Sequence, residues 1–282
     1  MSELIWMNGE IMLLADARIG VEDRGFQFAD GVYEVIRLYN GKPFAMEAHL
    51  QRLQKSAGGI QLALPIDISD LGKEIGRFLA RAPMRDGMIY LQLTRGEAPR
   101  NHAFSASKPT LLFYARALPP LADPNSGEGV KLLSVADERW QRCWIKSIAL
   151  LPNVLAKNQA LAAGADEAVF VDNGIVTECA ASNIFAVIKG HVVTHPVGSK
   201  VLPGITRDIL MEIAPKIGVA FDQRAFREEE AINADELFIT STTREISWVK
   251  AWNDRQVGQG RVGPITLKLH GALREKIANE TA

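Results

Sequence analysis

Pairs of apolar runs joined by a turn dipeptide recur along the chain. An Asn-Gly dipeptide supplies the positive φ angles of a tight hairpin turn, so each such pair predicts two antiparallel strands. Further apolar runs at residues 130–135, 143–148 and 236–241 predict additional strands. The predicted hairpin turns lie at Asn8-Gly9, Asn40-Gly41, Asn173-Gly174 and Lys189-Gly190.

Helical periodicity, with apolar residues three or four apart, replaces this pattern in five segments. One of them has Pro152 near its first turn and Gly164 just past its end, as helices favour. In another, Thr206 stands where a capping hydroxyl would begin the helix, and apolar residues follow it. The predicted helices cover residues 47–58, 71–82, 152–164, 204–218 and 270–280.

The order of these elements predicts an α+β protein with two domains. Hairpins outnumber β-α-β crossovers, which argues against a doubly wound parallel sheet. A stretch rich in proline, glycine, serine and aspartate follows residue 117 and has the composition of an exposed connector. We therefore expect a small N-terminal α+β domain at residues 1–116, a connector at 117–125 and a larger C-terminal α+β domain at 126–282.

The composition indicates a cytoplasmic protein that acts on small molecules. The chain has 32 basic and 33 acidic side chains, so it has no net field that would attract nucleic acid. Its two cysteines, Cys143 and Cys179, form no CxxC pair, which argues against a zinc site or a disulfide framework, and no metal is expected. No run approaches the roughly 20 apolar residues that cross a bilayer, so no membrane partner is expected.

Two ionisable residues near apolar strands are candidates for catalysis. Lys146 lies in the apolar segment 144–148, where burial would lower the pKa of its amine and make it a nucleophile. Glu178 follows a predicted hairpin strand, where its carboxylate could keep the ring nitrogen of a cofactor protonated. Taken alone, each pattern also fits a simpler alternative: Lys146 points outward from a half-exposed strand, and Glu178 is a solvated residue at a strand end.

A glycine turn that leads into a helix is a candidate phosphate site. Leu202-Pro203-Gly204 precedes Ile205-Thr206, and the backbone N–H groups at the start of a helix favour an anion. The hydroxyls of Ser241-Thr242-Thr243 could donate to the same phosphate. An ordinary helix cap and an ordinary turn have the same pattern.

A loop after residue 94 carries a candidate site for a carboxylate. Arg100 and His102 lie in it, and both side chains suit a carboxylate ligand. Tyr33, in an apolar strand, could present its phenol to a ligand. A surface loop with solvated charges and a core tyrosine are the alternatives.

In their order along the chain, these motifs resemble those of the fold-type IV pyridoxal-phosphate enzymes, and within them the D-amino-acid aminotransferase branch. The resemblance covers nearly the whole chain, with the connector and the C-terminal tail least constrained. The Pro-Arg-x-His motif at residues 99–102 distinguishes this branch from other enzymes of the same fold. The matching segments are residues 23–34, 49–53, 94–96, 99–102, 140, 142–143, 145–147, 176–178, 182–183, 204–208, 240–243 and 245–246.

The resemblance implies a role for each candidate. Lys146 would be the catalytic lysine and would bind pyridoxal 5'-phosphate as a Schiff base, and Glu178 would contact the pyridine nitrogen. Tyr33, Arg100 and His102 would trap the substrate carboxylate. The last two would come from the partner subunit of a homodimer with active sites near the subunit interface. Arg52, Ile205, Thr206, Ser241 and Thr242 would surround the phosphate, and Leu202 would pack against the ring.

The chain departs from the family pattern at Ala180-Ala181, which occupies a stretch that is usually rich in serine. The departure removes hydroxyl groups that would contact phosphate or substrate. It leaves the lysine chemistry unaffected.

The implied reaction is a ping-pong transamination from D-amino acids, such as D-alanine or D-glutamate, to pyruvate or 2-oxoglutarate. The freed Lys146 would move a proton between the substrate α-carbon and the cofactor, while Glu178 holds the pyridinium proton. Two alternatives share the fold: an aminotransferase for L-branched-chain or (R)-amine substrates, and an aminodeoxychorismate lyase. A cofactor-binding protein without catalytic activity is a third alternative.

Overall fold

The computed structural model describes residues 3–104, 106–121, 123–125 and 127–282, and the chain packs into two compact units. Unit 1 comprises Met1–Pro120, Ile145–Ala149 and Glu280–Ala282, and unit 2 comprises Leu121–Trp144 and Leu150–Asn279. A single cut in the chain does not separate the two units, because Ile145–Ala149 belongs to unit 1 while its neighbours on both sides belong to unit 2.

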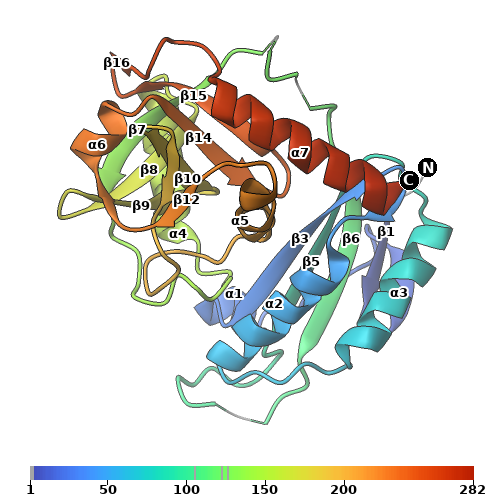
Figure 1. The fold of residues 1–282 in the computed structure, drawn as a ribbon. Helices are drawn as coiled ribbons and strands as arrows, with labels where there is room; N and C mark the ends of the chain where they lie inside the picture. Colours follow the sequence, from blue (N-terminus) through green and yellow to red (C-terminus); the bar gives the residue numbers. More distant parts are fainter. Residues whose placement is uncertain (1–2, 105, 122, 126) are drawn as a thin grey trace. The chain divides into compact units, whose positions relative to one another are not determined.

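Unit 1 is an antiparallel sheet with helices on one face (Figure 1). Its elements are β1 (Leu4–Met7), β2 (Glu10–Leu13), α1 (Arg24–Phe28), β3 (Gly31–Tyr39), β4 (Lys42–Pro43), α2 (Met46–Gly59), α3 (Ile68–Arg81), β5 (Gly87–Thr94) and β6 (Thr110–Ala117). The six strands follow the order β2-β1-β6-β5-β3-β4.

One row of cross-strand partners shows which face of this sheet the helices cover. Glu34, Leu91, Phe113 and Trp6 lie opposite one another on adjacent strands, so their side chains share a face. Glu34 bonds to side chains of α2, and Phe113 packs against Phe78 of α3. Both helices therefore cover the face that contains the buried side chains of β5.

Unit 2 is built on a larger, mixed sheet. Its strands are β7 (Val130–Ala136), β8 (Glu167–Asp172), β9 (Ile175–Cys179), β10 (Asn183–Ile188), β11 (His191–Thr194), β12 (Phe221–Gln223), β13 (Phe226–Arg227), β14 (Glu236–Ser241), β15 (Glu245–Trp252) and β16 (Arg255–Gln256). The order is β12-β11-β10-β14-β15-β7-β8-β9-β13, and β16 pairs with β15. The pairs β7–β8, β7–β15 and β11–β12 are parallel.

The helices of unit 2 are α4 (Leu151–Ala162), α5 (Ile205–Lys216), α6 (Glu228–Ile232) and α7 (Pro264–Thr281), whose last residues are counted in unit 1. Helix α4 packs against β8 through Ala156 and Ala160, and α5 packs against β14. The first turn of α7 is capped by Glu236, whose carboxylate accepts from the backbone N–H groups of Ile265 and Thr266. These contacts hold α4 and α5 against the sheet and fix the start of α7.

The predicted α+β architecture and the four predicted hairpins are confirmed. Each hairpin turns at the expected dipeptide, and the turn residues have positive φ, for example 50° at Asn8 and 102° at Gly9. Helix α4, at Leu151–Ala162, begins and ends within two residues of the predicted limits, with Pro152 in its first turn. The short elements α1, α6, β12, β13 and β16 were not predicted, because segments of two to five residues contain too few positions to establish a period.

Two local predictions are wrong. Residues 143–148 form turns in place of a strand, with one bridge between Ser147 and Val32. The segment is apolar because it is a buried connection, in which Ile145 is shielded from water. Thr206 is not the cap of α5, since the helix starts at Ile205 after Gly204 and places Thr206 in its first turn.

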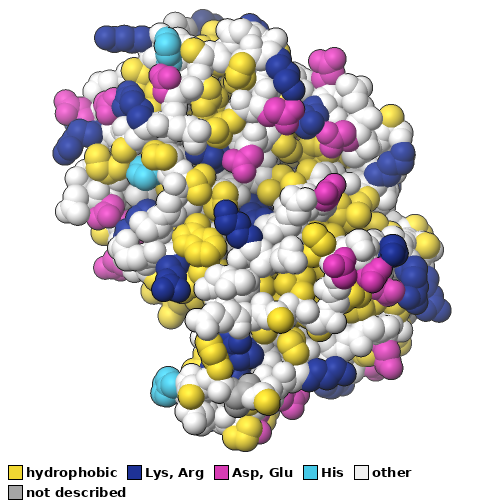
Figure 2. Space-filling view, turned by 60° about the horizontal axis from the view of Figure 1, so that its bottom comes forward, with side chains coloured by type: hydrophobic (Ala, Val, Ile, Leu, Met, Phe, Trp, Pro, Cys, Tyr) yellow, Lys and Arg dark blue, Asp and Glu magenta, His cyan; other side chains and the backbone are white. Residues whose placement is uncertain are grey.

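Charged side chains of both signs are interspersed on the face of the molecule drawn in Figure 2. Within the part of the chain that the structure describes, no helix has the length and apolar character needed to span a membrane. In the same residues, no group of three or more His, Cys, Asp or Glu side chains is placed to bind a metal ion.

Candidate active site

The backbone of Lys146 is held by two elements of unit 1. The N–H of Tyr33, on β3, donates to the carbonyl of Lys146 at 3.0 Å, and the N–H of Lys146 donates to Ser56 Oγ, on α2, at 3.1 Å. The Lys146 amine lies 4.2 Å from the centroid of the Tyr33 ring. The structure therefore brings the two predicted residues together and leaves the amine half-buried.

A buried ionic cluster lies on the face of β3 that α2 covers, opposite the face that carries Tyr33. Arg52 donates through Nε and Nη2 to both oxygens of Glu34, at 2.7 and 2.8 Å, and His49 Nδ1 lies 2.8 Å from the same carboxylate. Burial alone would raise the pKa of Glu34, but the charge and hydrogen bonds of Arg52, with His49, lower it to about 2. Arg52 is thus held in one orientation by a carboxylate that stays ionised.

We expect Glu34→Gln to reduce the free energy of unfolding by about 3 to 5 kcal/mol, because it leaves the Arg52 guanidinium buried without its counterion. The depressed pKa has a second consequence. The stability that this ion pair contributes is present above pH 4.5 and is lost as the pH falls toward about 2. Urea unfolding at neutral and acidic pH measures both effects.

The matched control is Asp70→Asn, which breaks an exposed ion pair with Lys73 on α3. It should leave the free energy of unfolding nearly unchanged, because water screens an exposed pair. Equal effects of the two substitutions would show that the buried cluster stabilises the fold no more than an exposed ion pair does.

The loop that carries Arg100 and His102 is organised around one aromatic ring. The Arg100 guanidinium lies 4.4 Å from the centroid of the Phe28 ring, and the His102 ring lies 5.4 Å from it. Both side chains are exposed. Within unit 1, the three predicted carboxylate ligands thus form two groups, with Tyr33 beside Lys146 and the other two around Phe28.

Arg24 anchors the backbone of this loop. Its guanidinium donates to the carbonyls of Asn101 at 2.5 Å, His102 at 3.4 Å and Ala103 at 3.5 Å. Asp30 accepts from Arg24 Nε at 2.9 Å and holds the guanidinium in place. The backbone of the loop is therefore fixed to Arg24 of α1 without a bound ligand.

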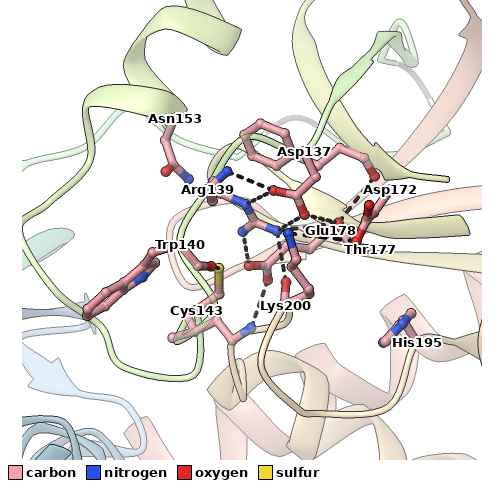
Figure 3. Close-up of polar contacts among 12 residues, drawn as sticks. Asp137, Arg139, Trp140, Cys143, Asn153, Asp172, Thr177, Glu178, His195 and Lys200 are labelled. Carbon is pink, nitrogen blue, oxygen red and sulfur yellow. Dashed lines mark hydrogen bonds and ion pairs between the residues drawn. The ribbon is translucent and has the colours of Figure 1, made fainter.

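Glu178 lies in the middle of a polar network in unit 2 (Figure 3). It belongs to β9 and is buried, so the alternative of a solvated strand-end residue is wrong. Arg139 Nη1 donates to Oε1 at 2.5 Å, while the Asn183 side chain and the Leu202 N–H donate to Oε2 at 3.1 and 3.0 Å. Burial raises the pKa of Glu178 to about 7, although Arg139 and the Leu202 N–H oppose the shift.

The start of α5 forms a cradle of backbone donors. Its N-terminus has no side-chain cap, so the N–H groups of its first turn remain available to an anion. A Cβ at Gly204 would lie 2.0 Å from Asn183 Oδ1, so only glycine allows this close approach. Asn183 pairs with Thr240 across the sheet, which brings the cradle next to Ser241 at the end of β14.

The residues of unit 2 fit pyridoxal phosphate. The cradle and the hydroxyls of Thr206, Ser241 and Thr242 provide donors for a phosphate, and Glu178 provides an acceptor for a ring N–H. Asn183 also donates to the Leu202 carbonyl at 3.0 Å, so it connects the cradle at the start of α5 with the network around Glu178. At the departure from the family pattern, Ala180 contributes a backbone carbonyl, which accepts from the Asn153 side chain at 2.8 Å.

Four residues of these networks were not predicted as site residues: Arg24, Glu34, Arg139 and Asn183. Glu34 bonds to a partner 18 positions away and Arg139 to one 39 positions away, so no local pattern could reveal these contacts. A weak signal existed at Asp137-Glu138-Arg139, where opposite charges two positions apart follow a strand.

Comparisons with known proteins identify relatives across the whole chain. The sequence model of the family described as Amino-transferase class IV matches residues 31–252. A D-alanine aminotransferase of Bacillus licheniformis is 39% identical over 281 residues, which cover 99% of this chain and 98% of that protein.

Solved structures of related enzymes have the same fold. A branched-chain amino acid aminotransferase of Escherichia coli superposes with a TM-score of 0.92 at 26% identity, covering 100% of this chain and 97% of that one. The corresponding enzyme of T.th., solved with pyridoxamine 5'-phosphate, gives a TM-score of 0.91 at 27% identity with the same coverage.

Proposed function

Because the chain belongs to the amino-transferase class IV family, and is a pyridoxal-phosphate-dependent aminotransferase, we propose that it transfers amino groups from D-amino acids to 2-oxo acids. The donors would be D-alanine or D-glutamate, and the acceptors pyruvate or 2-oxoglutarate. The observation that carries this proposal is the 39% identity to a D-alanine aminotransferase over nearly the full length of both chains. The branched-chain enzymes with the same fold are only 26 to 27% identical.

In this proposal the polar network and the cradle of unit 2 would hold the cofactor. Glu178 would accept from the ring N–H, Leu202 would pack against the ring, and Arg52 is proposed as a further phosphate ligand. Pyridoxal phosphate supplies an electron sink for the substrate α-carbon. The phosphate donors are Ile205, Thr206, Ser241 and Thr242.

Lys146 has two tasks in the proposed ping-pong reaction. Its amine would hold the cofactor between turnovers, and once free it would move the proton that leaves the substrate α-carbon. Its backbone is fixed on β3 and α2, so the flexible side chain alone has to move.

The proposed functional form is a homodimer in which Arg100 and His102 reach the partner's site. Support comes from α4, whose outer face exposes Leu151, Val154, Leu155 and Leu161, the first by 67%. Val154 and Leu155 lie three and four positions after Leu151, and Leu161 lies seven after Val154, so the four residues form an apolar stripe opposite the buried Ala156 and Ala160. A second copy that covers this stripe would remove it from water.

The test is a half-reaction of the purified holoenzyme with single amino acids. D-alanine and D-glutamate should each convert the absorbance of bound pyridoxal phosphate to that of pyridoxamine phosphate, and L-leucine should not. Conversion by L-leucine alone would refute the proposal and favour the branched-chain alternative. Pyruvate release from aminodeoxychorismate would favour the lyase.

We expect Arg100→Ala to raise KM for both amino and keto acids by about 10- to 100-fold, since a hydrogen bond to a charged group contributes about 1.5 to 3 kcal/mol. The effect on kcat should be smaller, because the residue binds the part of the substrate that does not react. Steady-state kinetics with D-alanine and pyruvate measure both parameters.

Arg85→Ala is the control for this substitution, because the Arg85 side chain is exposed and makes a long contact of 3.8 Å with Asp86. Its kinetics should equal those of the unmodified enzyme. An unchanged KM in Arg100→Ala for every substrate would contradict the proposed carboxylate trap.

A further inference from the structure

We infer that Arg139 is a positioning residue that keeps the proton shared by Glu178 and the cofactor's ring nitrogen on the ring. The inference rests on the proposed function, because it takes Glu178 as the partner of that nitrogen. It concerns a side chain that touches neither substrate nor cofactor and acts through Glu178 alone. Three features support it: the occupancy of the carboxylate, the rigidity of the guanidinium and the balance of charge.

The Glu178 carboxylate has one acceptor position left. An ionised carboxylate offers about four lone-pair positions. Three are filled: Oε1 accepts from Arg139, and Oε2 accepts from Asn183 and from the Leu202 N–H. The remaining position is on Oε1, so a ring N–H would bind the same oxygen atom that accepts from Arg139.

The Arg139 guanidinium cannot turn away from this oxygen. Nε and Nη2 donate to the two oxygens of Asp137, both at 2.9 Å, and Nη2 also donates to the Lys200 carbonyl at 2.8 Å. The centroid of the Phe170 ring lies 4.3 Å from the guanidinium carbon. Figure 3 shows Asp137 and Glu178 on either side of the same guanidinium. Arg139 is thus a fixed positive charge at 2.5 Å from Oε1.

The fixed charge decides where the shared proton resides. One proton lies between the carboxyl group and the ring nitrogen, either as carboxylate with pyridinium or as carboxylic acid with neutral pyridine. Burial favours the neutral pair and raises the pKa of Glu178, while Arg139 is the largest contribution in the opposite direction. Removing the cation would leave the proton count unchanged and move the proton from the ring to the carboxyl group.

The test uses holoenzyme loaded with pyridoxal phosphate that is labelled with nitrogen-15 in the ring. The nitrogen chemical shift distinguishes a protonated ring from a neutral one, with free cofactor in acid and in alkali as references. At mildly alkaline pH the unmodified enzyme should show a protonated ring, and Arg139→Met a neutral one. The half-reaction with D-alanine should slow by about 10- to 100-fold, equivalent to one or two pKa units. A protonated ring in Arg139→Met would overturn the inference.

Lys157→Met is the matched control. Lys157 Nζ lies 3.6 Å from Glu167, which is a second buried carboxylate of unit 2 outside the proposed site. Loss of this cation tests the general effect of removing a positive charge next to a buried acid. The ring should stay protonated, and an equal loss of ring protonation in both variants would overturn the inference.

Two variants that keep the cation cover the case in which Arg139→Met does not fold. Arg139→Lys should restore a protonated ring, and a neutral ring in this variant would refute the role of the charge. Asp137→Asn removes a negative charge that raises the pKa of Glu178. The shared proton should therefore stay on the ring at mildly alkaline pH, and a neutral ring in this variant would overturn the inference.

Failure of the inference is distinguishable from failure of the proposed function. If the unmodified protein binds pyridoxal phosphate and D-alanine converts it, the function stands whatever Arg139→Met shows. If the unmodified holoenzyme already contains a neutral ring, Glu178 does not have the proposed role, and the inference fails with it.

Discussion

Lys146→Ala is expected to lower the rate of D-alanine transamination by at least about 10³-fold, because proton transfer by a positioned side chain contributes about 10² to 10⁴ and this variant also loses the covalent link. Cofactor binding should persist, since in the proposed site Glu178 and the start of α5 would still hold the ring nitrogen and the phosphate. Borohydride, which reduces a lysine-bound Schiff base to a stable amine, should attach the cofactor to the unmodified protein and not to this variant.

Lys250→Ala is the control for this result. Lys250 is a partly exposed lysine that pairs with Glu128 at 3.1 Å, away from the proposed site. It should keep both activity and covalent attachment. Full activity in Lys146→Ala would refute the proposed mechanism.

Glu178→Gln should have opposite effects on activity and stability. Removal of the carboxylate should slow transamination by about 10²-fold, because the ring nitrogen loses its ionised partner. Between pH 4.5 and about 7 the folded protein binds a proton at Glu178 more tightly than the unfolded chain, so stability falls as the pH rises through this range and stays low above it.

A shift from 4.5 to about 7 corresponds to roughly 3 kcal/mol. The cofactor-free Glu178→Gln protein should therefore be more stable than the unmodified protein at alkaline pH by about 1 to 3 kcal/mol. Arg139 keeps Asp137 as its counterion in the variant. Thermal unfolding of both cofactor-free proteins at acidic and alkaline pH measures the difference, and a difference that does not grow with pH would contradict it.

The parts of the fold that the sequence predicted well are those decided within a few residues. The Asn-Gly turns impose positive φ, and Pro152 and Gly164 mark the limits of a helix. The segment around Lys146 was predicted as a strand because an apolar run has the same appearance in a strand and in a buried connection. Its conformation depends on contacts with β3 and α2, at least 90 positions earlier in the chain.

The residues of the candidate site also fall into a group that could be predicted from the sequence and a group that could not. Residues that stand in recognisable motifs, such as Lys146 and the start of α5, could be named from the sequence through a family resemblance. The residues that set their charge and orientation could not. Arg139 looks like an ordinary surface arginine until the fold buries it beside Glu178.

The close approach of Gly204 to Asn183 has a mechanical consequence. One amide group touches the backbone at the start of α5 through its oxygen and the Glu178 carboxylate through its nitrogen. In the proposed site, this amide therefore links the start of α5, which would hold the phosphate, to the carboxylate that would hold the ring nitrogen.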